Sequence, residues 1–340
     1  MAEAQIHNDL MTCLRLPGQS GFEKPIRDYL IQKLSPYGEI SKDNLGSIIC
    51  KIKGKTSNHK WYFGAHMDTC GFIVHSIDSN GIIKCANFGY QSTEACQMQP
   101  VAVTTSQGKV NGLMYAKATD KKKSFTIDLG MKSSTNVRAL GIKAGDPVHF
   151  TNNPYLIGNP AEQIICSPRL DNRFGIFELM LLANLFKQYP PSDDVYLVAT
   201  VEEEMGARGA KTTATKIKPD LAIILDITYD EPPVHMGLGP VITLSDKSSV
   251  LSSQVRDFLL KIGEDCGIPL QTEVWNIGST DAGSVRTIGE GVPTIPILTA
   301  TKNNHTPHEI GCIKDCYAIS EFCLRLVEFG GTKLLEVFNQ

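Results

Sequence analysis

Three consecutive glutamates at the end of a hydrophobic stretch are the residues of this sequence best suited to chemistry. Glu202, Glu203 and Glu204 follow a strand expected at 195–201 and precede a glycine turn. Crowded carboxylates repel one another and call for a compensating cation. One of them can bind a metal ion while its neighbour accepts a proton from metal-bound water. A solvated acidic cluster is the alternative, because a charge run usually faces water.

A histidine and an aspartate also close an expected strand. His66 and Asp68 lie in the segment GAHMD, directly after the apolar run WYF. At this spacing the Asp68 carboxylate can accept the second ring N–H of a metal-binding histidine and fix its tautomer. Taken alone, the pair would more often be an exposed histidine and a turn aspartate.

Three further residues carry ligand groups at the boundaries of expected elements. Asp171 stands where a helix with an apolar face begins, Asp226 closes the hydrophobic strand LAIIL, and His305 follows the run VPTIPILTA. Each has an ordinary explanation, since aspartate caps helices and starts turns, and a loop histidine is usually solvated. Their value as ligands depends on whether the fold brings them together.

The joint placement of the candidates favours a metal site. Five of them follow expected strands: His66, Glu203, Glu204, Asp226 and His305. In an open parallel sheet the strand ends share one edge, where ligands bind. Histidine and carboxylate ligands fit zinc, manganese or cobalt rather than a soft thiolate site. With Asp171 the ligands are too many for one catalytic ion, so we expect two ions about 3.5–4 Å apart with Asp171 as the bridge.

Alternating helix and strand patterns supply the frame for these residues. Helical patterns occur at about 172–188, 207–215, 250–265 and 313–328, and strand patterns at 194–201, 221–226, 270–275 and 292–299. This alternation predicts an α/β fold with a mostly parallel sheet covered by helices. Upstream, the segment SGFE at 20–23 is expected to form a capping box that opens another helix.

The pattern changes between residues 73 and 164. Short β-type runs follow one another there, separated by Gly, Asn, Asp and Lys clusters. That density of short strands predicts a small β-barrel or sandwich-like unit. We therefore expect a catalytic α/β domain over residues 1–72 and 165–340, interrupted by an inserted β-rich domain over residues 73–164.

The composition argues against several classes of protein. The chain has 340 residues, with 33 Lys and Arg against 36 Asp and Glu, and a formal net charge of −3. Near-neutral charge without basic blocks argues against a nucleic-acid binder, and no apolar run approaches the roughly 20 residues that span a bilayer. The ten cysteines include no CxxC pair, which argues against a zinc ribbon. The first residues lack the pattern of a secretory signal, so we expect a cytoplasmic protein with reduced cysteines.

Ten segments, in order along nearly the whole chain, resemble the tetrahedral aminopeptidases, a family of cocatalytic metallopeptidases that includes glutamyl and deblocking aminopeptidases. They are GQSGFE (18–23), DNLGSI (43–48), GAHMDTCGF (64–72), DLGMKSSTNVRALGIKAGDPVHF (128–150), RLDNRFG (169–175), TVEEEMGARGA (200–210), LDIT (225–228), GLGPVI (237–242), STDAG (279–283) and GVPTIPI with HTPHE (291–309). The resemblance implies an α/β catalytic domain with an inserted small β-barrel or PDZ-like dimerisation domain.

The resemblance also implies a role for each candidate residue. The implied metal ligands are His66, Asp171 as the bridge, Glu204, Asp226 and His305, with Glu203 as general base and Asp68 orienting His66. The cofactors would be two divalent metal ions per subunit, zinc in the first place and cobalt or manganese as alternatives.

Some positions depart from the family pattern or have no implied role. The family commonly has an acidic residue, a second aspartate and a glutamine where this chain has Thr69-Cys70, Asn172 and Glu202. None of these is an implied ligand. The roles of three further residues stay open: Cys70, Asp281 and His308.

The expected function is removal of the N-terminal residue from short peptides by a two-metal-activated water, with Glu203 as general base. An N-deacylase or another amidase acting on small amides could use the same site. A non-catalytic oligomeric scaffold with structural metals is a third alternative, and a spare Glu203 beside Glu204 argues against it. By resemblance, the chain is expected to form dimers through the β insertion, which assemble into a tetrahedral dodecamer. The sequence does not specify the preferred N-terminal residue.

Overall fold

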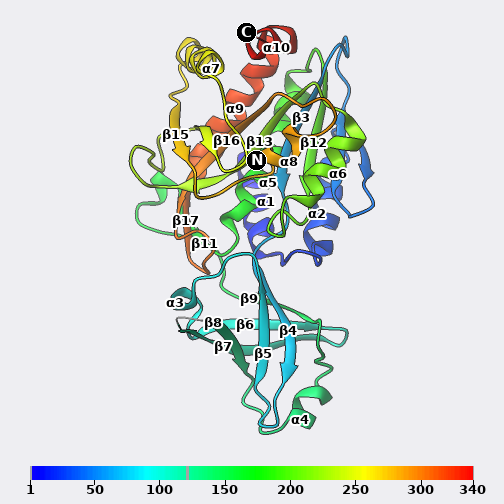
Figure 1. Cartoon of the computed structure of the whole chain (residues 1–340), viewed down its shortest axis with the longest axis vertical. Helices are drawn as coiled ribbons and strands as arrows, with labels where there is room; N and C mark the ends of the chain where they lie inside the picture. Colours follow the sequence, from blue (N-terminus) through cyan, green and yellow to red (C-terminus); the bar gives the residue numbers. More distant parts are fainter. Residues whose placement is uncertain (1, 120–121, 340) are drawn as a thin grey trace.

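Alternating strands and helices build the larger part of the molecule, and a barrel of short strands builds the smaller part (Figure 1). The computed structural model describes residues 2–119 and 122–339. Within these residues, eleven strands form the main sheet. They are β1 (Glu39–Lys42), β2 (Ile48–Ile52), β3 (Lys60–His66), β10 (Tyr155–Leu156), β11 (Ile164–Ser167), β12 (Asp194–Thr200), β13 (Leu221–Tyr229), β14 (Val241–Asp246), β15 (Gln271–Trp275), β16 (Thr294–Lys302) and β17 (Glu309–Cys312).

Parallel pairing in the middle of this sheet sets the positions of the strand ends. The order β12-β3-β13-β16 is parallel throughout, whereas β2 and β17 join it in antiparallel pairs. Thr200 at the end of β12 pairs with His66 at the end of β3. Ile224 of β13 pairs with Gly64, which brings Asp226 level with His66. The predicted α/β fold with a mostly parallel core is confirmed.

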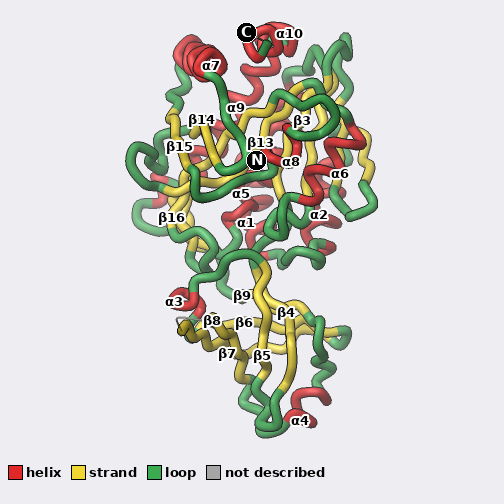
Figure 2. The backbone as a smooth tube through the Cα atoms, in the orientation of Figure 1, coloured by secondary structure: helices red, strands yellow, loops and turns green. Residues whose placement is uncertain are grey.

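Helices cover both faces of the sheet (Figure 2). They are α1 (Ala2–Arg15), α2 (Lys24–Leu34), α5 (Leu170–Gln188), α6 (Arg208–Ile217), α7 (Ser253–Cys266), α8 (Ala282–Arg286), α9 (Ile313–Phe329) and α10 (Gly331–Phe338). Trp61 and Phe63 of β3 point to the core under α5 and α9, while Tyr62 between them points to the core under α6 and α8. This alternation buries both faces and explains the continuous apolar pattern of the central strands.

The smaller part is a closed barrel with a core of its own. Its strands, in the order β4-β5-β8-β7-β6-β9, are β4 (Gly71–Ile77), β5 (Ile83–Phe88), β6 (Gln99–Thr105), β7 (Gly108–Thr119), β8 (Lys122–Asp128) and β9 (Pro147–Phe150), with helices α3 (Thr93–Cys96) and α4 (Ser134–Ala139). Phe72 packs against Phe125 and Phe150, with ring centroids 4.8 and 5.7 Å away. The predicted β-rich unit is therefore a barrel, while the limits at residues 73 and 164 stay a prediction.

Two local predictions were wrong. The SGFE capping box does not form, because α2 begins at Lys24 without a side-chain cap and the Ser20 hydroxyl donates to Asp68 instead. Asp226 does not close its strand, because β13 continues for three more residues to Tyr229.

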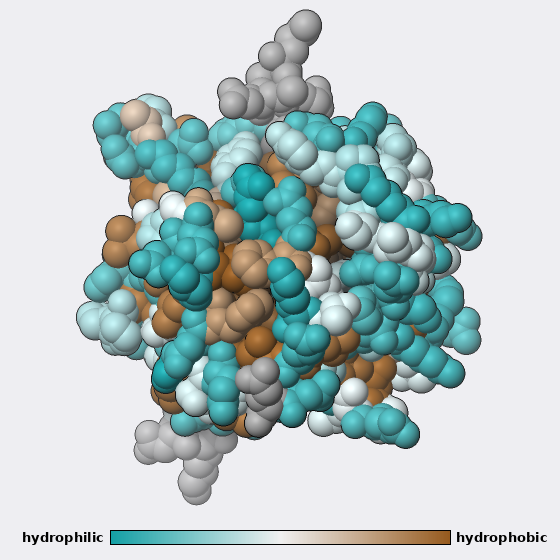
Figure 3. Space-filling view, turned by 90° about the horizontal axis from the view of Figure 1, so that it is seen from above, coloured by the Kyte–Doolittle hydropathy of each residue, from teal (hydrophilic) through white to brown (hydrophobic). Residues whose placement is uncertain are grey.

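The surface seen from above is largely hydrophilic (Figure 3), and the cysteines carry free thiols. Seen from above, hydrophilic residues cover most of the molecule and hydrophobic residues gather near the middle of this face (Figure 3). Across residues 2–119 and 122–339, every helix is too short or too polar to cross a membrane. All ten cysteines are free thiols.

Candidate metal centre

The carboxyl ends of the parallel strands bring the predicted ligands to one cavity. His66 ends β3, Asp226 lies in β13, and His305 follows β16. Glu203 and Glu204 follow β12, and Asp171 comes from the start of α5. All six residues line a cavity of ≈ 800 Å³. The structure thus gathers residues that lie up to about 240 positions apart in the chain, as expected at the ligand-binding edge of a parallel sheet.

Asp171 lies between the two histidines. Its Oδ1 is 3.0 Å from Nε2 of His66, and its Oδ2 is 2.8 Å from Nε2 of His305. On the first side, Oδ1 of Asp226 is 3.5 Å from the same His66 nitrogen. On the second side, Glu204 offers an oxygen close to His305. The side chains therefore form two adjacent groups, one of His66, Asp171 and Asp226 and one of Cys70, Glu204 and His305, and Asp171 contacts the histidines of both.

The charges of the centre call for cations. Burial would raise the pKa of Asp171, but hydrogen bonds from His305 and His66 hold it well below its usual range. Burial would lower the pKa of His305, yet the Asp171 carboxylate outweighs it and raises that pKa to about 10. Burial and the Asp171 charge raise the pKa of Glu204 to about 7.

No lysine or arginine lines this cavity among the residues that the structure describes, so the two imidazoles alone face the carboxylates. Imidazole nitrogens and carboxylate oxygens are the donors that divalent zinc, cobalt or manganese accept. The donor set therefore fits metal ions, which would replace the imidazole protons as the compensating charge.

Asp68 holds the loop of Glu203 and Glu204 in place through hydrogen bonds. Its carboxylate accepts hydrogen bonds from the Ser20 hydroxyl at 2.7 Å and from the backbone N–H groups of Glu203 and Glu204 at 3.0 and 3.2 Å. Nδ1 of His66 lies 3.1 Å from the backbone carbonyl of Asp68 and 3.6 Å from its Oδ1. Asp68 therefore contacts His66 chiefly through its backbone, and its carboxylate fixes the loop that carries the two glutamates.

Glu309 positions two candidate ligands, a role that was not predicted from the sequence. Its buried carboxylate accepts hydrogen bonds from the backbone N–H of Asp171 at 3.1 Å and from that of His305 at 2.8 Å. Burial, with the Asp171 charge adding to it, raises the pKa of Glu309 to about 8. The only signal in the sequence was its place in the segment HTPHE.

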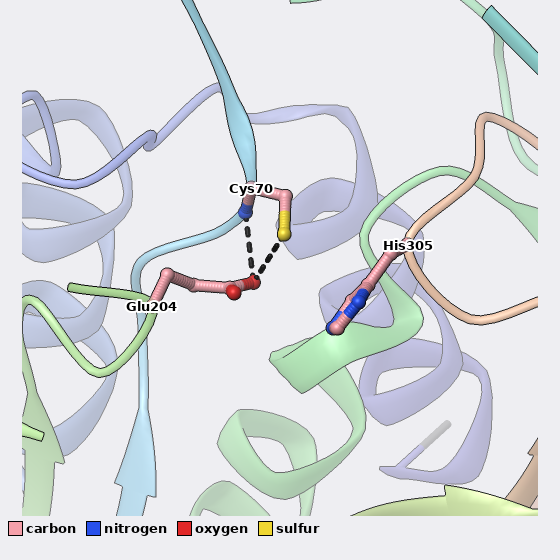
Figure 4. Close-up of side chains that lie close together, drawn as sticks. All are labelled: Cys70, Glu204 and His305. Atoms are coloured by element: carbon pink, nitrogen blue, oxygen red, sulfur yellow. Dashed lines mark hydrogen bonds between the residues drawn. The ribbon is translucent and has the colours of Figure 1, made fainter. Parts of the chain in front are cut away.

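Cys70 touches Glu204 directly. Its backbone N–H and its thiol both donate to Oε1 of Glu204, at 2.9 and 2.8 Å, and His305 faces the same space (Figure 4). The three ligand atoms lie within 4.8 Å of one another. Burial and the Glu204 charge raise the pKa of the Cys70 thiol well above its ordinary value. The thiol is therefore a neutral hydrogen-bond donor to a candidate ligand.

Three residues without an implied ligand role form contacts with other parts of the chain. Asn172 donates to the Leu225 carbonyl at 2.8 Å, and Glu202 pairs with Arg208 at 3.1 Å. Asp281 is buried and accepts a hydrogen bond from the Thr200 hydroxyl at 2.6 Å.

His308 belongs to neither of the two ligand groups found among the described residues.

Comparisons with known proteins agree with this architecture. The family model for the M42 glutamyl aminopeptidases matches residues 46–322. A curated protein of Acetivibrio thermocellus is 31% identical over 329 residues, which cover 93% of this chain and 96% of that protein.

Two solved structures superpose over almost the whole chain. The TET aminopeptidase from a marine sediment archaeon of the Thaumarchaeota has a TM-score of 0.93 at 27% identity, covering 99% of this chain and 100% of that one. The TET1 peptidase of Pyrococcus horikoshii, which can assemble into a tetrahedron or a large octahedral shell, has a TM-score of 0.84 at 25% identity, covering 95% and 99%.

Proposed function

Because this chain belongs to the M42 glutamyl aminopeptidase family, we propose that it removes the N-terminal residue from short peptides with the help of two divalent metal ions. Membership of this family makes it a metal-dependent aminopeptidase. The number of ions, the ligands and the general base are part of the proposal.

The arrangement of Asp171 carries the proposal of two ions. Each of its oxygens faces a different histidine, at 3.0 Å for His66 and 2.8 Å for His305. One ion would be held by His66, Asp171 and Asp226, and the other by Asp171, Glu204 and His305. Zinc fits these donors first, with cobalt or manganese as alternatives. Ions bound there would act as Lewis acids, polarising a substrate carbonyl and lowering the pKa of water from 15.7 to about 7.

Glu203 is proposed as the general base. It lines the same cavity, and Asp68 holds its backbone N–H at 3.0 Å. Burial raises its pKa well above the ordinary value, with the charges of Asp281 and Asp226 adding to the effect. Glu203 takes a proton from the attacking water and delivers it to the leaving amine, a contribution of about 10²–10⁴-fold.

The test is Glu203→Gln, with Glu202→Gln as its matched control. Glu202 is the adjacent glutamate, but its side chain pairs with Arg208. We expect Glu203→Gln to keep its metal content and lose about 10²–10⁴-fold in kcat on aminoacyl-anilides, while Glu202→Gln keeps both. Metal analysis and kinetics after chelation and re-addition of zinc, cobalt or manganese give the two readouts. Full turnover by Glu203→Gln would show that the base is another residue, and cleavage of N-acyl amino acids instead of aminoacyl-anilides would favour a deacylase.

We also propose that the chain self-associates through the β-rich insertion at residues 73–164 and forms dimers that build a dodecamer. Support comes from the TET1 peptidase of Pyrococcus horikoshii, which can assemble into a tetrahedron or a large octahedral shell. Apolar side chains on the barrel are also available, since Leu113 and Tyr115 of β7 are 36% and 39% exposed in the single chain. Native mass spectrometry should give twelve times the chain mass of 37.2 kDa. A monomer at micromolar concentration would refute this assembly.

A further inference from the structure

The cavity that holds the candidate ligands has more room than the ions and a peptide bond require. Beyond the ligands, it is lined by residues of β13, β14 and β15. Its volume of ≈ 800 Å³ lies within the range of sites that enclose a whole small ligand. The walls away from the ligands therefore define a compartment for a substrate side chain.

One wall of this compartment carries a buried carboxylate. Glu273 is 6% exposed, and its two oxygens accept hydrogen bonds from the hydroxyls of Thr243 at 2.7 Å and Thr228 at 2.8 Å. No lysine or arginine lines the cavity beside it among the described residues. Burial therefore raises the pKa of Glu273, and a cationic ligand group placed beside this carboxyl would favour its charged form.

A second carboxylate leaves a buried oxygen without a partner. Asp246 is 8% exposed and lines the same cavity. Its Oδ1 accepts hydrogen bonds from the backbone N–H groups of Ser248 and Ser249, both at 2.6 Å. Its Oδ2 has no hydrogen-bond partner among the described residues. Buried acceptors are nearly always satisfied, so this atom indicates a missing donor.

Aromatic rings form another wall. Tyr229 and Trp275 stack with ring centroids 5.1 Å apart, and both line the cavity. Such faces suit the methylene groups of a long side chain and attract a cation at its end. Two lysines lie near residues of the cavity wall, but neither lines the cavity itself. Lys247 follows Asp246 in the chain, and Nζ of Lys123 in the barrel lies 4.0 Å from the centroid of the Tyr90 ring.

We propose that this compartment receives the side chain of the N-terminal residue and selects lysine or arginine, whose cationic end pairs with Glu273 and Asp246. The inference rests on the proposed aminopeptidase function. A glutamate side chain would add a third negative charge to this compartment, and leucine would leave both carboxylates without a partner. The chain should therefore disfavour acidic N-terminal residues.

The experiment compares lysyl-, arginyl-, leucyl- and glutamyl-anilides with the wild type and three variants. Glu273→Gln and Asp246→Asn each remove one charge while keeping the shape of the side chain. Asp230→Asn is the control, because Asp230 pairs with Lys302 at 3.0 Å and does not line the cavity. For the wild type we expect kcat/KM highest for lysyl- or arginyl-anilide and lowest for glutamyl-anilide. Each cavity variant should lower the lysyl-to-leucyl ratio about tenfold or more, and Asp230→Asn should leave it unchanged.

The outcomes separate this inference from the proposed function. Wild-type preference for leucyl- or glutamyl-anilide would overturn the inference and leave the aminopeptidase function intact. A lysyl-to-leucyl ratio that neither cavity variant changes would do the same. If no aminoacyl-anilide were cleaved by the metal-loaded chain, the proposed function itself would be wrong. Should Glu273→Gln fail to fold, Asp246→Asn decides alone, together with inhibition of the wild type by free lysine against free leucine.

Discussion

Replacing Asp68 by asparagine tests how the structure fixes the glutamate pair. The carboxylate accepts two backbone N–H groups, those of Glu203 and Glu204, on different oxygens. An asparagine keeps only one oxygen, so its NH₂ group must face one of these N–H donors in either orientation. One partly buried donor then loses its acceptor, which costs up to about 1–3 kcal/mol of the free energy of unfolding. The loop that carries the proposed base and a proposed ligand should loosen as a result.

The measurements are metal content, kcat and the free energy of unfolding of the metal-free chain. We expect Asp68→Asn to weaken metal binding about 10–100-fold, as loss of a group that supports metal ligands usually does, and to lower kcat. Ser20→Ala is the control, because it removes a different donor to the same carboxylate and leaves both glutamate N–H groups satisfied. This control should lose about 0.5–1.5 kcal/mol and keep its metals. Unfolding and metal affinity of Asp68→Asn equal to the wild type would refute the role assigned to this carboxylate.

Two further predictions concern a buried histidine and the thiol beside Glu204. Burial, with the charge of Arg169 adding to it, lowers the pKa of His149 to about 3, so the folded chain stays neutral there while the unfolded chain binds a proton below about pH 6.5. Stability is therefore lost as the pH falls, and between pH 7 and pH 5 the wild type should lose about 2 kcal/mol more than His149→Gln in urea unfolding; equal losses would contradict this. A mercurial reagent should inhibit the wild type but not Cys70→Ala, because the Cys70 thiol contacts Glu204. Cys85→Ala is the control and should be inhibited like the wild type, because Cys85 lies in the barrel. Equal inhibition of all three proteins would show that the sensitive thiol is another cysteine.

The gathering of the candidate ligands could be predicted from the sequence because it follows from strand ends. His66 and Asp226 stand at or near the ends of apolar runs, and parallel pairing places such ends at one edge of the sheet. The neighbouring residues were enough to place them at strand ends, because a buried parallel strand appears in the sequence as a short apolar run. The chain also matches the family model over residues 46–322, as the order of the motifs indicated.

The contacts that hold these ligands in place were not predictable, because they join residues far apart in the chain. Ser20 has the spacing of a helix cap, yet it donates to Asp68, and Glu309 accepts from Asp171 across 138 positions. Helical and strand periodicity describe only neighbours within a few residues. Tertiary packing therefore decided the partner in both cases. Closure of the barrel has the same cause, since Phe72 of β4 pairs with Val148 of β9, which lies far along the chain.

The carboxylates of this site fall into two sets with opposite consequences for the fold. Asp68 and Glu309 each accept two backbone N–H groups, so their oxygens are satisfied within the chain and fix the segments that carry the ligands. Asp171 instead turns both oxygens toward imidazoles, whose protons must leave before a metal ion can bind. The first set shapes the site without any ion, and the second becomes fully compensated only by cations. Metal ions that bind only the folded state should therefore raise the free energy of unfolding. They should not be needed to form the architecture of the site.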